Sequence, residues 1–148
     1  MHTETRWLCL ALAAAVTFQL FYLGAQPFAA GLIPGPWDKL AHLAVFAVLT
    51  ALLWIGTAGR MPIAVIATVI AIGALDELHQ ASLPGRFADA ADFLADACAA
   101  TGTGFSLFLL HVRRKASERA SISATTGRTA QAHTTSLRES PAARKTAP

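Results

Sequence analysis

Residues 62–80 read PIAVIATVIAIGALDELHQ, an uncharged run followed by two adjacent carboxylic acids. The uncharged part, residues 62–75, contains 14 residues, which as a helix with a rise of about 1.5 Å per residue would be about 21 Å long. The hydrocarbon core of a bilayer is about 30 Å thick. A helix that crosses it must therefore continue to about Gln80, which places Asp76 and Glu77 at membrane depth. Ionisable side chains at that depth generally face other helices or a wet cavity and mark a functional site.

The composition also indicates a membrane protein. Of the 148 residues, 54% are hydrophobic and only 14% are charged, with a mean hydropathy of +0.47, whereas soluble domains contain about 25% charged residues. The formal net charge of +3 is concentrated near the C-terminus, because residues 113–148 contain eight Lys and Arg against two Glu. The remainder of the chain is therefore net acidic.

Apolar length and the positions of Pro and Gly predict an all-α bundle of four transmembrane helices. The third helix has its uncharged run before its acidic residues, and the fourth has the two in the opposite order. Its uncharged run, residues 97–110, again contains 14 residues. Asp92 and Asp96, which precede this run, must then also lie at membrane depth. The four predicted helices cover residues 7–24, 38–55, 62–80 and 89–110.

These helices place the transmembrane domain at residues 1–115. For the first helix a cleaved signal peptide is the alternative, but no clear A-x-A cleavage site follows it, which favours a retained helix. Residues 116–148 contain almost no large apolar side chains, so they are predicted to form a disordered, basic cytoplasmic tail.

The distribution of Lys and Arg predicts the orientation in the membrane. Arg6, Arg60 and the basic cluster at 113–115 fall on one side of a four-pass topology, so both termini are expected in the cytoplasm and the protein in the inner (plasma) membrane. The polar ends of the second, third and fourth helices then meet at the external face.

The spacing of the polar residues gives each of these three helices one polar face. Asp38 and His42 are four residues apart, as are Asp76 and Gln80, and the aspartates at 89, 92 and 96 follow an i, i+3, i+7 pattern. Exposing a polar face to lipid would cost a prohibitive amount of free energy, so the three faces are expected to face one another.

Eight residues are the candidate ligand-binding residues, and we call them the polar cup. Arg86 lies in the turn between two acidic faces and is expected to pair with them, whereas His79 points elsewhere and is expected at the membrane interface. Asp38 is equally suited to capping the second helix, and His42 to acting as a ligand, a proton carrier or a hydrogen-bond partner. The polar cup consists of Asp38, His42, Asp76, Glu77, Gln80, Arg86, Asp92 and Asp96.

Four short motifs occur in a fixed order along residues 7–112. They are Asp38-Lys39-x-x-His42-x-x-x-Phe46, Asp76-Glu77-x-x-Gln80, Pro84-Gly85-Arg86, and Asp89-x-x-Asp92-x-x-x-x-Ala97 before Gly102. Together they resemble the VanZ-like membrane proteins, although Asp96 stands where Asn would be expected. The resemblance implies a small polytopic membrane protein. The founding member of that family is linked to low-level resistance to the glycopeptide teicoplanin, which implies a role in the cell envelope.

The first functional hypothesis is a binding protein. Its external polar cup would hold a charged group of an envelope lipid or cell-wall precursor, with Arg86 and His42 toward an anionic part and the carboxylates toward a cationic part. This hypothesis needs no cofactor; the expected partners are membrane lipids and that ligand, and nucleic acid is not expected.

The second hypothesis is a metal-dependent membrane enzyme acting on a lipid-linked phosphate. Clusters of Asp, Glu and His can hold a divalent metal ion and activate water. Only His42 is well placed as a nitrogen ligand, so an oxygen-ligated metal is favoured over zinc. A transporter is less favoured, because four helices provide no path across the membrane unless they oligomerise.

Overall fold

The computed structural model describes residues 3–29 and 32–139, and the regular elements in these ranges are all helical. The predicted all-α fold class is confirmed. Four helices contain segments long and apolar enough to cross a membrane, which indicates a multi-pass membrane protein. The elements are α1 (Thr3–Gly24), the short 3-10 helix η1 (Pro27–Ala29), α2 (Gly35–Gly56), α3 (Pro62–Ala81) and α4 (Ala90–Glu139).

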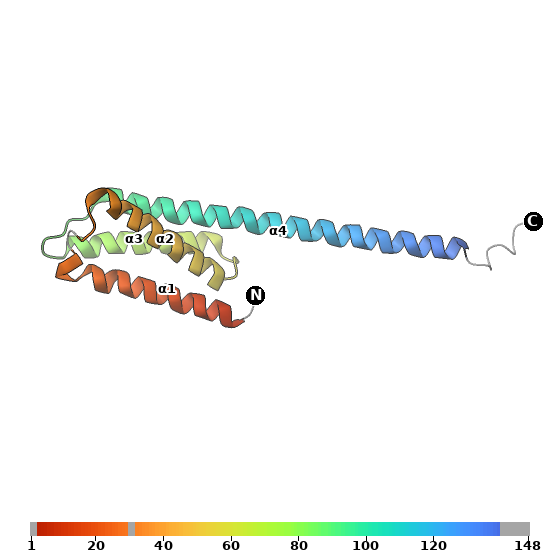
Figure 1. Cartoon of the computed structure of the whole chain (residues 1–148), viewed down its shortest axis with the longest axis horizontal. Coiled ribbons are helices and arrows are strands. Elements are labelled where there is room, and N and C mark those ends of the chain that lie inside the picture. Colours follow the sequence, from red (N-terminus) through yellow and green to blue (C-terminus); the bar gives the residue numbers. More distant parts are fainter. Residues whose placement is uncertain (1–2, 30–31, 140–148) are drawn as a thin grey trace, which may run out of the picture. The chain divides into compact units, whose positions relative to one another are not determined.

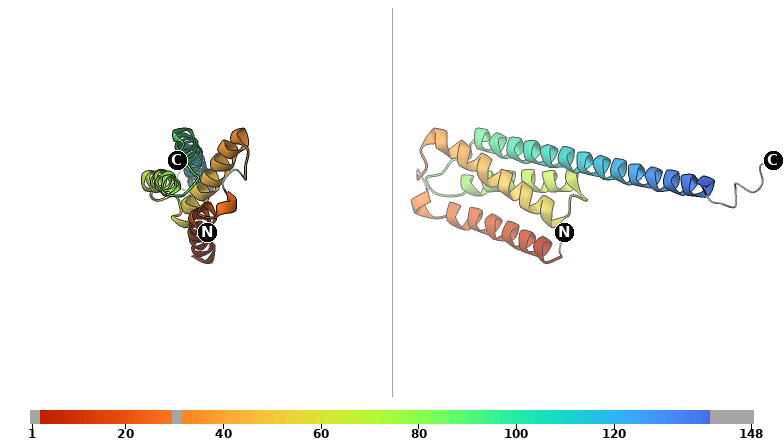
Figure 2. Two further views of the ribbon diagram at one scale, coloured as in Figure 1. Left: turned by 90° about the vertical axis from the view of Figure 1, so that its left-hand side faces the viewer. Right: turned by 45° about the vertical axis from the view of Figure 1, so that its right-hand side comes forward.

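Residues 1–109 and 110–148 form two compact units. In the first unit the connections after α1 and α3 lie at one end of the bundle, and the connection between α2 and α3 lies at the other, beside the start of α1 (Figure 1). Arg6 Nε donates a hydrogen bond to the Gly56 carbonyl oxygen at 3.1 Å, which joins the start of α1 to the end of α2. Figure 2 shows that α2 is tilted relative to its neighbours.

The helix boundaries are set by prolines and by residues whose backbone adopts the left-handed conformation. α2 and α3 each have a proline in the first turn, where its missing N–H is not needed. After α2 the chain reverses through Ala58 and Gly59, with φ of 56° and 65°. Because α2 begins at Gly35 with Pro34 as its N-cap, Asp38 lies within the first turn and is not the cap. The capping alternative for Asp38 is therefore wrong.

The core is small and close-packed. Its buried members come from all four helices of the first unit, and close helix approach is visible at two glycines. A side-chain carbon at Gly73 would lie 2.9 Å from Asp96 Oδ2, and one at Gly104 would lie 2.6 Å from Ile66, whereas Gly102 faces open space. The core residues are Ala13, Phe46, Leu49, Val69, Ala99 and Ala100.

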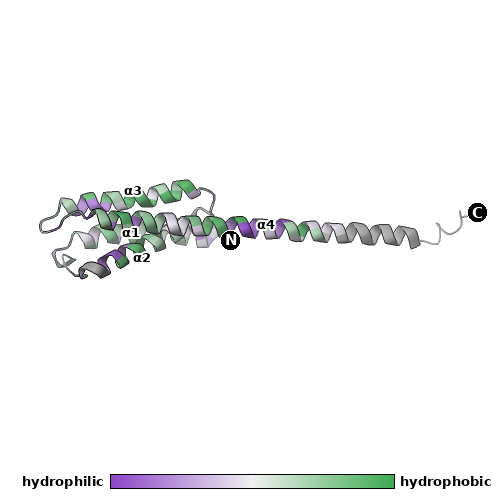
Figure 3. Ribbon diagram, turned by 90° about the horizontal axis from the view of Figure 1, so that it is seen from above, coloured by the Kyte–Doolittle hydropathy of each residue, from purple (hydrophilic) through white to green (hydrophobic). Residues whose placement is uncertain are grey.

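Many large apolar side chains lie outside this core. Trp7, Phe18 and Ile63 are 66%, 65% and 82% exposed. A soluble monomer rarely exposes so much apolar surface, but a bilayer solvates it. Hydrophilic residues of α2 and α3 instead gather toward one end of a mostly apolar bundle (Figure 3).

Residues 116–139 differ from the predicted disordered tail, because the structure continues α4 as a helix to Glu139. Residues 140–148 of that tail lie outside the described residues. No proline occurs between Gly85 and Ser140, and Ala and Arg favour helix. A helix already nucleated in an apolar segment can therefore be extended at little free-energy cost per residue.

Candidate functional site

The polar ends of α2, α3 and α4 meet at the end of the bundle that carries the 82–89 connection. Lys39 Nζ of α2 lies 2.9 Å from Asp89 Oδ2 and 2.9 Å from Asp92 Oδ1. The backbone N–H of Asp89 donates to Glu77 Oε2 of α3 at 2.7 Å. These contacts join the three polar faces that the residue spacing predicted to face one another.

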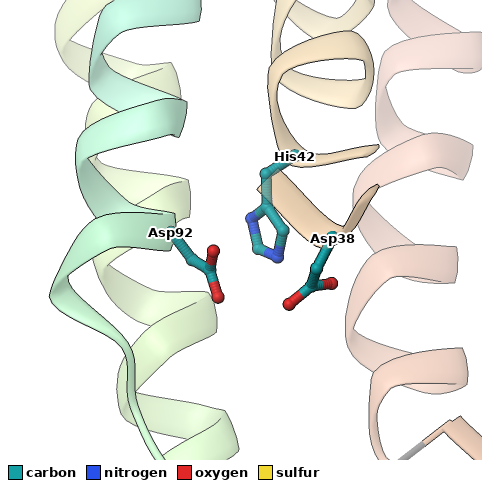
Figure 4. A group of neighbouring side chains, drawn as sticks. All are labelled: Asp38, His42 and Asp92. Atoms are coloured by element: carbon teal, nitrogen blue, oxygen red, sulfur yellow. The ribbon is translucent and has the colours of Figure 1, made fainter. Parts of the chain in front are cut away.

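A histidine–aspartate pair whose aspartate is fully buried lies at the same end of the bundle. His42 Nδ1 is 2.9 Å from Asp96 Oδ1, and Asp96 is fully buried. Because a carboxylate accepts hydrogen bonds, Nδ1 carries a proton, and in the neutral ring Nε2 is left as the acceptor nitrogen. Gly73 permits this pair, since any side chain there would displace Asp96. Figure 4 shows the His42 ring between the carboxylates of Asp38 and Asp92.

The cation that pairs with the acidic residues is Lys39, and the predicted pairing of Arg86 is wrong. Arg86 Nη1 donates to the Gly24 carbonyl oxygen at 2.5 Å, and no ion pair of Arg86 occurs among the described residues. The end of α1 attracts this guanidinium because the last carbonyls of a helix are unpaired and carry partial negative charge. Lys39, in contrast, lowers the pKa of the exposed Asp89 by donating a hydrogen bond to its carboxylate.

Three buried carboxylates each have one oxygen without a partner. Asp76 Oδ2 accepts from Gln80 Nε2 at 2.8 Å, and Glu77 Oε2 accepts from the Asp89 backbone. Asp76 Oδ1, Glu77 Oε1 and Asp96 Oδ2 have no hydrogen-bond partner among the described residues. Buried polar atoms are nearly always hydrogen-bonded, so three such atoms in one cluster require an explanation.

A cavity of about 520 Å³ opens between α1, α2, α3 and the connection after α1. Its walls are mainly apolar side chains of α1, of α2 and of Phe28, Ala29, Leu32 and Ile33. Its polar lining comes from α1, α2, α3 and the 82–89 connection. Glu77, Asp92 and Asp96 do not line it. The members of the polar cup that line the cavity are Asp38, His42, Asp76, Gln80 and Arg86.

The sequence reasoning missed two polar residues of this region and the role of α1. Gln19 of α1 lines the cavity; a polar side chain inside an otherwise apolar helix could have identified it from the sequence. Lys39 forms ion pairs with two aspartates; its position next to Asp38 in the sequence could have identified it. His79, which was expected outside the site, does not line the cavity, and its ring packs against Phe21 with centroids 5.4 Å apart.

Two groups of three metal-ligating side chains share His42. One group is Asp38, His42 and Asp92, and the other is His42, Asp76 and Glu77, with one ligand atom per residue within 4.8 Å of the others in each group. The site can thus present either carboxylate oxygens or an imidazole nitrogen to a ligand.

No protein-family model, curated protein or solved structure matches the chain. The similarity to VanZ-like proteins therefore stays a prediction that depends on the four motifs.

Proposed function

We propose that this chain is a VanZ-like membrane protein that binds a charged, amphipathic envelope lipid or lipid-linked cell-wall precursor. The supporting observation is the cavity of about 520 Å³, whose apolar walls end at Asp38, His42, Asp76, Gln80 and Arg86. Its volume falls in the range of about 300–1,000 Å³ that is typical of small-molecule sites. An acyl or prenyl chain would contact the α1 and α2 walls, while the head group would contact the polar lining.

The polar lining suits a head group with both charges. Arg86 provides hydrogen-bond donors for an anionic group, as does His42 Nε2 when the ring is protonated at both nitrogens, and Asp38 and Asp76 provide acceptors for a cationic one. The second hypothesis, a metal-dependent enzyme acting on a lipid-linked phosphate, would use the same cavity and differs by requiring a bound metal ion.

Narrowing the cavity should displace the lipid. Ala15 lines the cavity, whereas its neighbour Ala14 is exposed on α1 outside it. We expect Ala15→Trp to reduce the lipid that co-purifies in mild detergent by about tenfold. The indole would displace lipid chain from the cavity, and the loss of two buried methylene groups at about 0.8 kcal/mol each weakens binding by about that factor. Ala14→Trp serves as the matched control and should retain the lipid.

Mass spectrometry of the purified proteins measures the bound lipid directly. Wild-type protein without any stoichiometric lipid, or equal retention by Ala15→Trp and Ala14→Trp, would contradict binding in this cavity.

The proposed orientation places both termini in the cytoplasm and the polar cup on the external side of the inner membrane, on the basis of the Lys and Arg distribution. We expect reporter fusions after Arg60 and after Lys115 to be active as cytoplasmic proteins. Fusions within 27–36 or 83–87 should report the external side. An external reporter after Lys115 would reverse the proposed orientation.

A further inference from the structure

Three side-chain atoms near the base of the cavity have lone pairs that no described residue uses. Asp76 Oδ1 and Glu77 Oε1 are buried without hydrogen-bond partners. His42 Nδ1 contacts Asp96, which in the neutral ring leaves the lone pair of Nε2 available to an ion. We propose that His42, Asp76 and Glu77 bind a divalent metal ion through these atoms.

The spacing of the three residues is close to that of metal ligands. One potential ligand atom from each residue lies within 4.8 Å of one from each of the other two, and two ligands on opposite sides of an ion with bonds of about 2.1 Å are about 4.2 Å apart. The three side chains would therefore have to move closer together around a bound ion. His42 and Asp76 also line the cavity, which gives an ion access to the site.

Hydrogen bonds from neighbouring groups hold each of the three proposed ligands in position. Asp96 accepts from His42 Nδ1, Gln80 donates to Asp76 Oδ2, and the Asp89 backbone donates to Glu77 Oε2. A metal-ligating histidine characteristically donates its other ring N–H to a carboxylate, which fixes its tautomer and orientation. Each proposed ligand is thus oriented by an atom that the metal would not use.

Charge balance also favours a bound cation. Asp76 is fully buried and Glu77 is 7% exposed, and a buried carboxylate is costly unless a cation or hydrogen bonds compensate it. Lys39 contacts Asp89 and Asp92, and Arg86 contacts the end of α1. Neither cation forms an ion pair with Asp76 or Glu77 in the described part of the chain.

The same contacts distinguish this group from the one formed by Asp38, His42 and Asp92. Asp92 already accepts from Lys39 at 2.9 Å, so that group has its own cation. One imidazole nitrogen with carboxylate oxygens suits Mn²⁺, because Zn²⁺ sites favour several nitrogen or sulfur ligands. The proposed metal binding depends only on these contacts and not on lipid binding, so it can be measured in the absence of lipid.

The test titrates chelator-treated, full-length protein in detergent with Mn²⁺ and follows the free ion by electron paramagnetic resonance. We expect one ion per wild-type chain, and at least about tenfold weaker binding in Asp76→Asn and in Glu77→Gln, since even loss of an outer-shell partner has an effect of that size. Glu4→Gln removes an exposed carboxylate in the first turn of α1, at the opposite end of the bundle from the 82–89 connection, and should bind Mn²⁺ like the wild type.

A second measurement uses the wild type alone, so it does not depend on the folding of any variant. Pulsed electron paramagnetic resonance should detect a nitrogen coupled to the bound Mn²⁺, which is the signature of His42. Absence of Mn²⁺ binding, absence of that nitrogen coupling, or equal weakening by Glu4→Gln would overturn the proposal. So would loss of binding in Asp38→Asn with retention in Asp76→Asn, because it would move the ion to the other group. The lipid that co-purifies with the wild type is measured separately from its Mn²⁺ binding, so lipid binding and metal binding can fail separately.

Discussion

His42→Leu is expected to lower the free energy of unfolding by about 3 kcal/mol, because leaving a buried acceptor without its hydrogen bond costs about 1–3 kcal/mol and more when the acceptor is charged. Asp96 is fully buried, and the His42 ring provides its only hydrogen bond in the described structure. Without that ring, both Asp96 oxygens would be buried and unpaired. Thermal melting and denaturant titration of the purified protein in detergent measure the loss.

The double variant His42→Leu with Asp96→Leu should recover most of that stability, because replacing both partners of a buried pair by apolar side chains is often neutral or stabilising. The control is His79→Leu, because His79 is half-buried and its Nδ1 has no partner among the described residues. That variant should melt like the wild type or at a higher temperature. A His42→Leu protein as stable as His79→Leu would show that the pair with Asp96 does not stabilise the fold.

Asp76→Asn is expected to keep or raise the melting temperature while it weakens binding of the proposed lipid ligand by about 10- to 100-fold. An amide keeps the shape of the side chain, and its oxygen can still accept from Gln80. Because no cation pairs with Asp76 in the described residues, neutralising it leaves no cation without its partner. The loss of binding reflects a hydrogen bond or ion contact to a charged group, which contributes about 1.5–3 kcal/mol.

Asp92→Asn provides the contrast, because Asp92 is 6% exposed and holds Lys39. This variant should melt at a lower temperature, with ligand binding reduced only in proportion to folded protein. The size of the stability loss is limited by the 41% exposure of the Lys39 side chain, since water partly compensates a cation that it reaches. Co-purified lipid and melting temperature are measured on the same preparations. If Asp76→Asn also melts early and loses lipid only in that proportion, its carboxylate serves the fold instead of a ligand.

The sequence by itself determined the helices, and it predicts that the acidic residues lie at membrane depth. An uncharged run of 14 residues before Asp76 is too short for a bilayer whatever surrounds it, and this length is a local property of the chain. The periodicity of a helix likewise places Asp38 beside His42 and Asp92 beside Asp96 before any packing is known. These features sufficed to predict the bundle and the convergence of three polar faces.

Only the tertiary structure decided which of these polar residues contact one another and which meet the cavity. Lys39 and Arg86 are both cations near acidic residues in the sequence, yet Lys39 holds the aspartates while Arg86 binds the end of α1. That choice depends on how far each side chain is from its partners after the helices pack, and residue spacing within one helix contains no such distance. The same holds for Gln19 and the wall formed by α1, because a cavity exists only where surfaces from separate helices fail to fill the space between them.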